Sequence, residues 1–584
     1  MIQIRTRLLG LKSHWVLAIP VVVVLVGAWM HHWVAEDAFI DFRVIRNMLA
    51  GHGPVFNIGQ RVEVYTDPLW VAVLAVVSFV LPFFGVEWWS VILGLAFTAL
   101  GFVSASAAAF RLSARFRQPG ERVLPLGLFV VSCVAVVWDF STSGLETGMI
   151  FGWIGLSWLL LVKTLDGESS ARRAALVASL GFTIRPDMAP ITVVLVAALW
   201  LVERATNPSW SRRRAVMLVV HGAAIPILSE LFRVAYFGLL TSNTAIAKSG
   251  TRLWLSQGWT YLWNFLSTYW LLVPLVGVVV LVAPLWRRLW REGERLRLVV
   301  MVAPAIGGLL DALYVTAIGG DFMHGRMYLP AFFACGAVAW CVVPRRAVMR
   351  LVVAALAVWG LWSLALARCG TGDEIAATGI ADERSYWVGW AGNSNPVTLK
   401  DYHRKVLEKD MSLRTPERSF AETVAASSAT TRPHLLIARQ LLEMSHRPYP
   451  AQLFVVEENV GIVGYSVPSE VFMIDGFALA SPVNSHFAVP VRTRPGHEKM
   501  GSPPWVLGQF APEYEHFYDI YFKGQVPAAT RALSCWPLAG YLNNISGPLS
   551  AAVVWRNLTH AVTWTTMSFS ADPTVAEREL CGSN

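Results

Sequence analysis

The sequence predicts an α-helical polytopic membrane protein with a C-terminal extracytoplasmic domain of mixed α/β structure. The chain has 584 residues, of which 55% are hydrophobic and only 15% are charged. Soluble proteins carry roughly 25% charged residues, so most of this chain is expected to lie in lipid. Long apolar stretches alternate with short polar ones up to residue 367, after which the chain resembles a soluble domain. We therefore expect a membrane domain over residues 1–367 and a globular domain over residues 368–584.

About eleven segments are candidates for transmembrane helices, each of which needs about 20 apolar residues. They cover approximately residues 15–34, 88–110, 123–138, 148–163, 174–184, 188–202, 215–232, 268–286, 297–318, 328–343 and 350–367. The segment 68–84, PLWVAVLAVVSFVLPFF, is also apolar. Counting it as a span would place a basic loop outside, against the positive-inside rule. We expect it to be an interfacial or re-entrant helix in the first outer loop, residues 35–87.

Basic loops set the predicted orientation. Arg and Lys cluster at the N-terminus and in loops at 111–122, 163–173, 203–214, 287–297 and 344–350. Two predicted spans separate each pair of consecutive clusters, so all of the clusters can lie in the cytoplasm. This predicts a multi-pass protein of a bacterial plasma membrane, with a cytoplasmic N-terminus and an extracytoplasmic C-terminal domain. The N-terminal apolar run lacks a small-residue cleavage site and is expected to be retained as an anchor.

The net charge of +9 arises largely from these loops. No basic stripe with interleaved aromatic residues occurs in the predicted soluble domain, which argues against nucleic-acid binding.

Three of the six cysteines fall in predicted spans and three in the predicted outer domain: Cys133, Cys335 and Cys341, and then Cys369, Cys535 and Cys581. The outer domain of a bacterial protein faces an oxidising compartment. Cys535 and Cys581 flank the C-terminal segment and are the favoured disulfide pair. The sequence leaves the other pairings open.

The polar motifs outside the basic loops all fall on the predicted outer face. They include the acids Glu36, Asp37, Asp139, Glu146, Asp187 and Asp321. Because the orientation follows from the basic loops alone, this convergence of carboxylates on one face is independent of it and indicates a functional site there.

The segment that follows the first span predicts a helix that begins near Asp37. AFIDFRVIRNMLAG has apolar residues at helical spacing, and Gly51 can end the helix in a left-handed turn. We expect this helix to lie along the membrane surface. Asp37 is either a helix N-cap, worth about 1 kcal/mol, or a functional carboxylate. An acid at the lipid boundary is costly unless it has a task or a partner.

Other candidate residues also have two interpretations. Lys248 ends an outer segment rich in Asn, Ser and Thr, and is either a phosphate ligand or a snorkelling side chain. Asp321, His324 and Arg326 precede a span, and form either a site or a turn with a cationic anchor. One histidine among scattered acids is a weak signal for a metal. Arg185 precedes a proline and is either a site cation or the flank of a helix-end turn.

Taken in order, these motifs resemble the integral-membrane GT-C glycosyltransferases, and among them the terminal arabinofuranosyltransferases of arabinogalactan and lipoarabinomannan biosynthesis. The similar segments are EDAFIDFRVIRNMLAGHGPVFNIGQRVEVYTDPLW, SGLET, RPD, YFGLLTSNTAIAK and GGDFMHGRMYLP, with ENVGIVGYSVPSEVFMIDGFALASP and RPGHEK in the outer domain. The chain departs from the family pattern at Glu36, where an Asp is expected, in EVYTDPLW and in the Ser of TSNTAIAK. These departures bear on the sugar and acceptor more than on the reaction class.

The resemblance implies inverting transfer of an arabinofuranosyl residue from decaprenyl-phosphoryl arabinose to a cell-wall arabinan acceptor. Asp37 would take the proton from the acceptor hydroxyl, with Glu36 in support. The donor's phosphate and sugar would be bound by Lys248, Arg326, Arg185, Asn243, Asp321, His324, Asp139 and Glu146. No organic cofactor is implied, whereas a divalent cation is compatible with the site. The outer domain is expected to bind the acceptor glycan.

Three alternatives stay open at this level. A mannosyl- or other glycosyltransferase that uses a polyprenyl-phosphate sugar has the same spacing of motifs. A lipid or glycan transporter would place its charges near the bilayer midplane and often contains paired repeats, neither of which is found. A glycan-binding scaffold without turnover would not need Asp37 together with Lys248.

Overall fold

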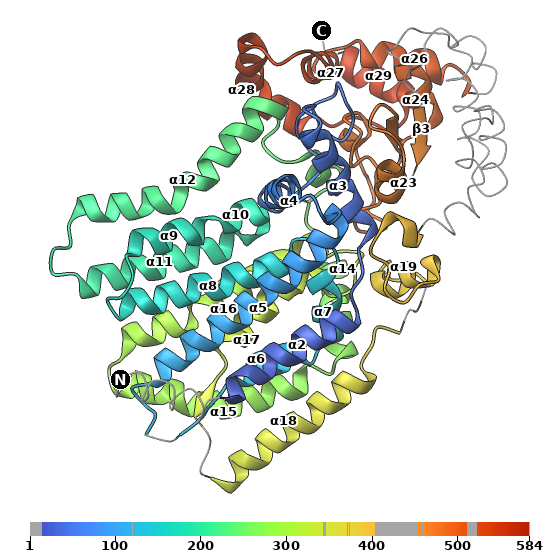
Figure 1. Cartoon of the computed structure of the whole chain (residues 1–584). Coiled ribbons are helices and arrows are strands. Elements are labelled where there is room, and N and C mark those ends of the chain that lie inside the picture. Colours follow the sequence, from blue (N-terminus) through green and yellow to red (C-terminus); the bar gives the residue numbers. More distant parts are fainter. Residues whose placement is uncertain are drawn as a thin grey trace.

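The computed structural model of the chain is mainly helical (Figure 1). It describes residues 15–582 apart from 119–120, 251, 343–345, 371, 373, 403–453, 458 and 511–521. Long helices run side by side through the bundle, and the C-terminal helices gather at one end of it (Figure 1).

Seven helical segments among the described residues are long and apolar enough to cross a membrane. They are α5 (Val86–Ser113), α8 (Thr147–Leu165), η2 (Pro186–Met188) with α11 (Ala189–Thr206), α12 (Arg212–Phe237), α15 (Leu272–Arg291), α16 (Arg295–Ile318) and α18 (Ala347–Leu366). Large apolar side chains on their outer faces are exposed, as at Val219, Leu228 and Leu361. Such apolar surface suits contact with lipid, and the chain is a polytopic membrane protein.

The other four predicted spans are short or broken helices. They correspond to η1 (Trp15–Ala18) with α2 (Ile19–Met30), α6 (Leu126–Ser132) with α7 (Ala135–Thr142), α9 (Ala171–Ser179) with α10 (Gly181–Ile184), and η3 (Arg326–Tyr328) with α17 (Leu329–Val338). These pieces are too short to count as spans by themselves, so the number of about eleven stays a prediction.

Segment 68–84 forms one short helix, α4 (Pro68–Val80). Its 13 residues reach about 20 Å at 1.5 Å per residue, whereas the hydrocarbon core is about 30 Å thick. The helix packs on α5 and α10. Its length agrees with the expectation that this segment does not cross the membrane.

Helices α5 and α8 are packed with their backbones in close contact. A Cβ added to Gly148 would lie 2.4 Å from the carbonyl oxygen of Gly94, and one added to Gly155 would lie 2.3 Å from that of Gly101. Small residues allow this close approach between membrane helices. The packing fixes the N-terminal end of α8, where Glu146 lies.

Helix α3 (Glu36–Leu49) is present as predicted, and Gly51 follows its C-terminus with a left-handed φ of 83°. Its position along the membrane surface stays a prediction. The helix is buried against α4 and against α23 (Val460–Ser466). Helix α23 belongs to the residues after 367, which we call the outer region after their predicted side of the membrane.

The polar face of α3 is covered by protein rather than by water. Arg43 is fully buried, and its guanidinium donates to the carbonyl oxygens of Phe56 at 2.8 Å and Val471 at 2.6 Å. A buried cation is tolerated when backbone acceptors satisfy its N–H groups. Hydrophobic spacing therefore predicted the helix, whereas long-range carbonyl acceptors determine its position.

The described outer region after residue 367 is also mostly helical. It contains α19 (Glu383–Ala391), α23, η5 (Asn484–His486), α24 (Pro503–Phe510), α26 (Gln525–Leu533), α27 (Leu538–Ser546), α28 (Ala551–Thr566) and α29 (Pro573–Cys581). Strands β3 (Phe454–Glu457) and β4 (Phe472–Asp475) pair in parallel. The predicted mixed α/β character depends on this one pair in the described part of the region. The division into two domains at residue 367 stays a prediction.

Four small elements complete the membrane part. They are β1 (Val123–Leu124), which pairs antiparallel with β2 (Cys341–Val342), and the helices α13 (Asn243–Ala247) and α14 (Leu255–Thr268).

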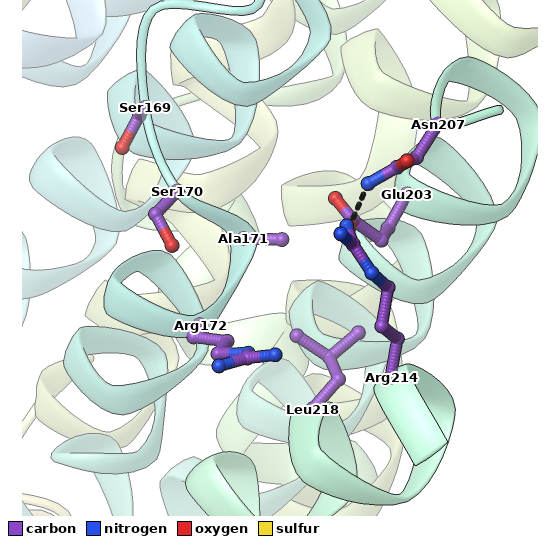
Figure 2. Close-up of a pocket in the computed structure, with 8 residues that line it drawn as sticks. All are labelled: Ser169, Ser170, Ala171, Arg172, Glu203, Asn207, Arg214 and Leu218. Atoms are coloured by element: carbon purple, nitrogen blue, oxygen red, sulfur yellow. Dashed lines mark hydrogen bonds and ion pairs between the residues drawn. The ribbon is translucent and has the colours of Figure 1, made fainter. Parts of the chain in front are cut away.

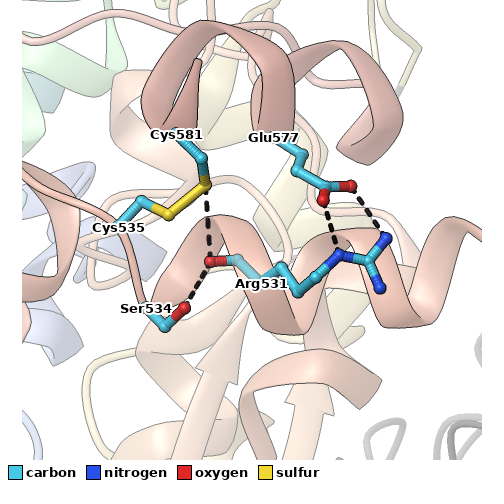
Figure 3. Close-up of a disulfide and its surroundings, with 5 residues drawn as sticks. All are labelled: Arg531, Ser534, Cys535, Glu577 and Cys581. Atoms are coloured by element: carbon cyan, nitrogen blue, oxygen red, sulfur yellow. Dashed lines mark hydrogen bonds and ion pairs between the residues drawn. A yellow bond between two sulfur atoms is a disulfide. The ribbon is translucent and has the colours of Figure 1, made fainter. Parts of the chain in front are cut away.

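A disulfide joins Cys535 to Cys581, the pair that the sequence favours (Figure 3). The same two segments are linked by Arg531, whose Nη2 lies 2.9 Å from a carboxylate oxygen of Glu577. The two contacts fasten α29 to the end of α26.

Candidate active site

A cavity of about 50 Å³ lies where α3, the loop before α4, the turn before α8 and α13 meet. Its polar lining consists of Asp37, Asp41, Tyr65, Thr66, Asp67, Glu146, Thr244, Lys248 and Arg326. Leu479 of the outer region also lines it. The structure thus brings together four of the predicted site residues, which come from distant parts of the sequence.

Asp37 and Asp41 extend from one face of α3, because residues four apart in a helix lie one turn apart. The N-cap of α3 is Ala35, which provides no side-chain cap, so Asp37 is not the N-cap. The Asp37 side chain is 22% exposed, whereas Asp41 is buried. Burial, together with the negative charges of Asp67, Glu146 and Asp37, raises the pKa of Asp41 well above its ordinary value.

Arg326 lies at the centre of the charged groups. Its Nη2 is 3.3 Å from Glu146 Oε2, and its Nη1 is 4.0 Å from both Asp37 Oδ2 and Asp321 Oδ2. A buried guanidinium surrounded by carboxylates can keep its charge without water. Arg326 therefore connects the α3 acid to the turn that precedes α8.

Arg185 holds Glu146 from the other side. Its Nη1 lies 2.7 Å from Glu146 Oε1, and its fork binds both oxygens of Asp187 at 2.7 Å. Burial alone raises the pKa of Glu146, but Arg326 and Arg185 together lower it to about 2. Glu146 is thus a permanently charged, buried support for Arg326. Arg185 does not itself line the cavity.

Lys248 follows the short helix α13, whose N-cap Ser242 accepts a hydrogen bond from the N–H of Ala245. Its Nζ lies 5.5 Å from the ring centroid of Phe322, and it has no ion-pair partner among the described residues. A lysine with three N–H donors beside a polar cavity can bind an oxyanion.

Glu36 points away from the cavity toward the outer region. Its Oε1 accepts the backbone N–H groups of Gly461 at 2.5 Å and Ile462 at 3.1 Å. Burial, and then the charge of Asp37, raise the pKa of Glu36 to about 8. Its contacts attach α3 to α23.

Asn243 holds an outer segment against the cavity. Its side-chain amide donates to the carbonyl oxygens of Ala478 at 3.1 Å and Leu479 at 2.8 Å, and its Oδ1 accepts from Ser485 Oγ at 2.8 Å. These contacts use the amide fully, so Asn243 positions Leu479 rather than facing the cavity.

His324 and Asp139 do not line the cavity either. The His324 ring nitrogens lie 2.6 Å from Asn264 Oδ1 and 3.2 Å from the Tyr269 hydroxyl, and burial lowers the pKa of this histidine to about 4. Asp139 Oδ1 lies 3.1 Å from His31 Nδ1 and 3.7 Å from Arg384 Nε. Both side chains tie structural segments together beside the site.

Two cavity carboxylates, Asp41 and Asp67, were not among the residues predicted from the sequence. The four-residue spacing from Asp37 is a signal that would have found Asp41. Asp67 stands before Pro68 and resembles a simple helix cap, but its side chain makes no cap hydrogen bond. Burial, and then the charge of Glu146, raise the pKa of Asp67 well above its ordinary value.

No group of three or more His, Cys, Asp or Glu side chains suited to a metal ion occurs in the described part of the chain. The cations near the cavity are instead Lys248, Arg326 and Arg185.

An apolar groove of about 200 Å³ runs beside α17. Its lining side chains belong to α6, α14, α15, α16 and α17, and include Leu262, Phe332 and Cys335. Because Arg326 starts η3 directly before α17, the groove begins within a few helical residues of the charged cavity.

A further cavity, of about 370 Å³, lies at the other end of α8 and α11 (Figure 2). Arg172 and Arg214 point into it, and Arg214 Nη1 is 3.3 Å from Glu203 Oε1. The 19 residues of α8 extend about 28 Å, so this arginine-rich end is far from the acidic cavity.

Comparisons with known proteins agree with the earlier resemblance. The AftB family C-terminal domain matches residues 399–579. The terminal β-(1→2)-arabinofuranosyltransferase of Mycobacterium tuberculosis is 30% identical over 600 aligned residues, which cover 94% of each chain. The protein of the same name in Corynebacterium glutamicum is 28% identical over 536 residues, covering 83% of this chain and 75% of the relative. No solved structure matches the chain.

Proposed function

The chain belongs to the family of terminal β-(1→2)-arabinofuranosyltransferases, and on this premise we propose that it moves an arabinofuranosyl residue from decaprenyl-phosphoryl arabinose to a cell-wall arabinan. It is a membrane glycosyltransferase. The observation that carries the proposal is the single cavity that contains a partly exposed carboxylate, Asp37, beside the cations Lys248 and Arg326.

The proposed reaction needs one base and a site for the leaving phosphate. Asp37 takes the proton as the acceptor oxygen bonds to the anomeric carbon. The bond from that carbon to the phosphate oxygen breaks, and its electron pair leaves with the polyprenyl phosphate. The leaving group gains one negative charge, which Lys248 and Arg326 stabilise. Glu146 and Arg185 hold Arg326 in place, while Glu36, Asn243, Asp139 and His324 hold the surrounding segments.

The polyprenyl chain of the donor is proposed to occupy the apolar groove beside α17. A lipid-linked phosphate at Arg326 lies at the start of that helix, and the groove contains almost only apolar side chains. Helix α4, in segment 68–84, begins directly after Asp67 and has exposed apolar side chains at Val76, Phe79 and Val80.

We also propose that the acidic cavity faces the outer side of the membrane. The arginine-rich end of α8 and α11 lies at the opposite end of the bundle, as the positive-inside rule expects of a cytoplasmic end. The outer region would then meet the cell-wall acceptor directly.

A transfer assay with the purified full chain in lipid nanodiscs tests the proposal. The donors are decaprenyl-phosphoryl arabinofuranose and the matching mannose lipid, and the acceptor is a short synthetic arabinan. Arabinose transfer without mannose transfer is the expected result. Transfer of mannose alone would replace the arabinose assignment with that of a mannosyltransferase.

Absence of both products, with donor still bound, would favour a scaffold. Movement of the lipid across the bilayer without transfer would favour a transporter.

A further inference from the structure

The outer segment Arg494–Lys499 is fastened to the membrane part next to Lys248. The Nζ of Lys499 donates to the carbonyl oxygen of Ile246 at 2.8 Å. Glu498 is paired with Arg492 at 2.6 Å, and Arg492 in turn donates to backbone carbonyls of the membrane part. These residues anchor the segment. Arg494, its first residue, takes no part in these contacts.

Arg494 and Lys248 approach the same aromatic ring. The guanidinium carbon of Arg494 and the Nζ of Lys248 each lie 5.5 Å from the ring centroid of Phe322. Gly496 packs against Phe322 and Lys248, since a Cβ added there would lie 3.4 Å from Phe322 Cδ1 and 3.6 Å from Lys248 Cε. Lys248 lines the cavity that contains Asp37. Arg494 shares the Phe322 ring with Lys248, and Phe322 directly follows Asp321, which contacts Arg326 of the cavity.

No hydrogen-bond acceptor for the guanidinium of Arg494 occurs in the described part of the chain. Its Nε is buried without a hydrogen-bond partner, and no ion pair of Arg494 occurs among the described residues. Burial lowers the pKa of Arg494, and the charges of Glu383 and Asp321 only partly offset this effect. Buried donors in proteins are nearly always satisfied, and an arginine stays charged. An unsatisfied arginine beside a substrate cavity indicates that a ligand supplies the acceptor.

We propose that Arg494 and Lys248 form a clamp for the phosphate of the lipid-linked donor, in which the outer region supplies the arginine. This inference rests on the proposed function. Arg326 is already engaged with Glu146 and two further carboxylates, whereas Arg494 and Lys248 have no carboxylate partner among the described residues. Two cations on one ring repel each other until an anion lies between them. An arginine fork with a lysine point charge suits a phosphate that becomes more negative as the sugar leaves.

Binding of polyprenyl phosphate without sugar to the full chain in nanodiscs tests the clamp. The variants are Arg494→Ala, Arg494→Lys and Lys248→Ala, with the exposed Arg578→Ala on α29 as the matched control. Uncharged polyprenol is the control ligand. We expect Arg494→Ala and Lys248→Ala each to weaken phosphate binding at least tenfold, with polyprenol binding unchanged. Arg494→Lys should be intermediate, and Arg578→Ala should bind like the wild type.

The same variants are then assayed for transfer to separate donor from acceptor effects. A raised KM for the donor is expected with Arg494→Ala. Unchanged phosphate affinity in Arg494→Ala, while Lys248→Ala binds weakly, would overturn the clamp and leave the proposed function standing. A raised KM for the arabinan alone would also overturn it. Wild type that binds polyprenyl phosphate through Arg494 but transfers no arabinose would reject the proposed function only.

Thermal unfolding is measured first for every variant. If Arg494→Ala does not fold, Arg494→Gln takes its place, because glutamine keeps a polar N–H donor at this position and removes the positive charge.

Discussion

Asp37 and Asp41 lie one turn apart on α3 and line the same cavity, but of these two carboxylates only Asp37 forms an ion pair with Arg326 among the described residues. The exposure of the two carboxylates also differs. Asp37 can be reached by a substrate, whereas Asp41 is buried. These differences favour Asp37 as the proposed base. Asp41 is then a buried neighbour that influences the electrostatic potential at Asp37.

Asp37→Asn is expected to lower kcat by about 10²–10⁴-fold, the usual contribution of a general base. Donor binding should change little, because the amide has the same shape and Lys248 is intact. The matched control is Asp166→Asn, at the other end of α8, where the carboxylate is 28% exposed. Steady-state transfer assays and polyprenyl phosphate binding measure the two effects. Equal rates for Asp37→Asn and wild type would remove Asp37 from the chemistry.

Stereochemistry provides a second prediction. The relatives are named for a β-(1→2) linkage, and an inverting enzyme makes a β linkage only from an α-configured donor. The enzyme is given the α-anomer and the β-anomer of the arabinose lipid in separate reactions, and NMR determines the configuration of the linkage in each product. We expect a β product from the α donor alone. A β product from the β donor would show retention, and a carboxylate of the cavity would then act as a nucleophile instead of a base.

Arg326→Ala is expected to destabilise the protein by about 3 kcal/mol, because it leaves buried carboxylates with fewer cationic partners. Among the described residues, Glu146 would keep only Arg185 as an ion-pair partner. In a double-mutant cycle, adding Glu146→Gln should recover part of this loss, since the uncompensated charge is gone. The free energy of unfolding is measured in nanodiscs for the wild type, the two single variants and the double variant. Strict additivity of the two changes would contradict the coupling.

Glu36 is expected to make stability depend on pH. Its pKa is raised to about 8 in the folded chain from an ordinary 4.5. Between these values the folded chain holds a proton that the unfolded chain has released, so the free energy of unfolding falls as pH rises. Glu36→Gln removes this dependence. The free energy of unfolding of the variant minus that of the wild type should therefore increase from pH 4.5 to pH 8. A constant difference across that range would be inconsistent with a buried, protonated Glu36.

The disulfide closes a loop of 46 residues between Cys535 and Cys581. The loop-entropy relation gives about 4 kcal/mol for such a loop. Cys535→Ser combined with Cys581→Ser should therefore lower the Tm of the outer region by several degrees. Reducing agent should lower the Tm of the wild type and leave the double variant unchanged. If neither the double substitution nor the reducing agent changes the Tm, Cys535 and Cys581 are not bonded in solution.

The sequence by itself determined the membrane class, the helical segments, the position of the terminating Gly51 and the chemical groups of the site. These properties follow from local signals, namely the length of apolar runs, helical spacing and short motifs. The motifs also contained Asp37, Glu146, Lys248 and Arg326, all of which line the cavity.

Only the tertiary structure decided which polar residues face the cavity and which hold neighbouring segments together. Glu36, Asn243, His324 and Asp139 have the same residue types as the cavity group, but backbone groups and neighbouring side chains occupy their polar atoms. It also showed Asp41 and Asp67 in the cavity, α3 as a buried helix, and Arg494 beside Lys248. The physical reason is that a polar atom's partner is set by long-range packing, where segments hundreds of residues apart supply donors and acceptors that no local pattern encodes.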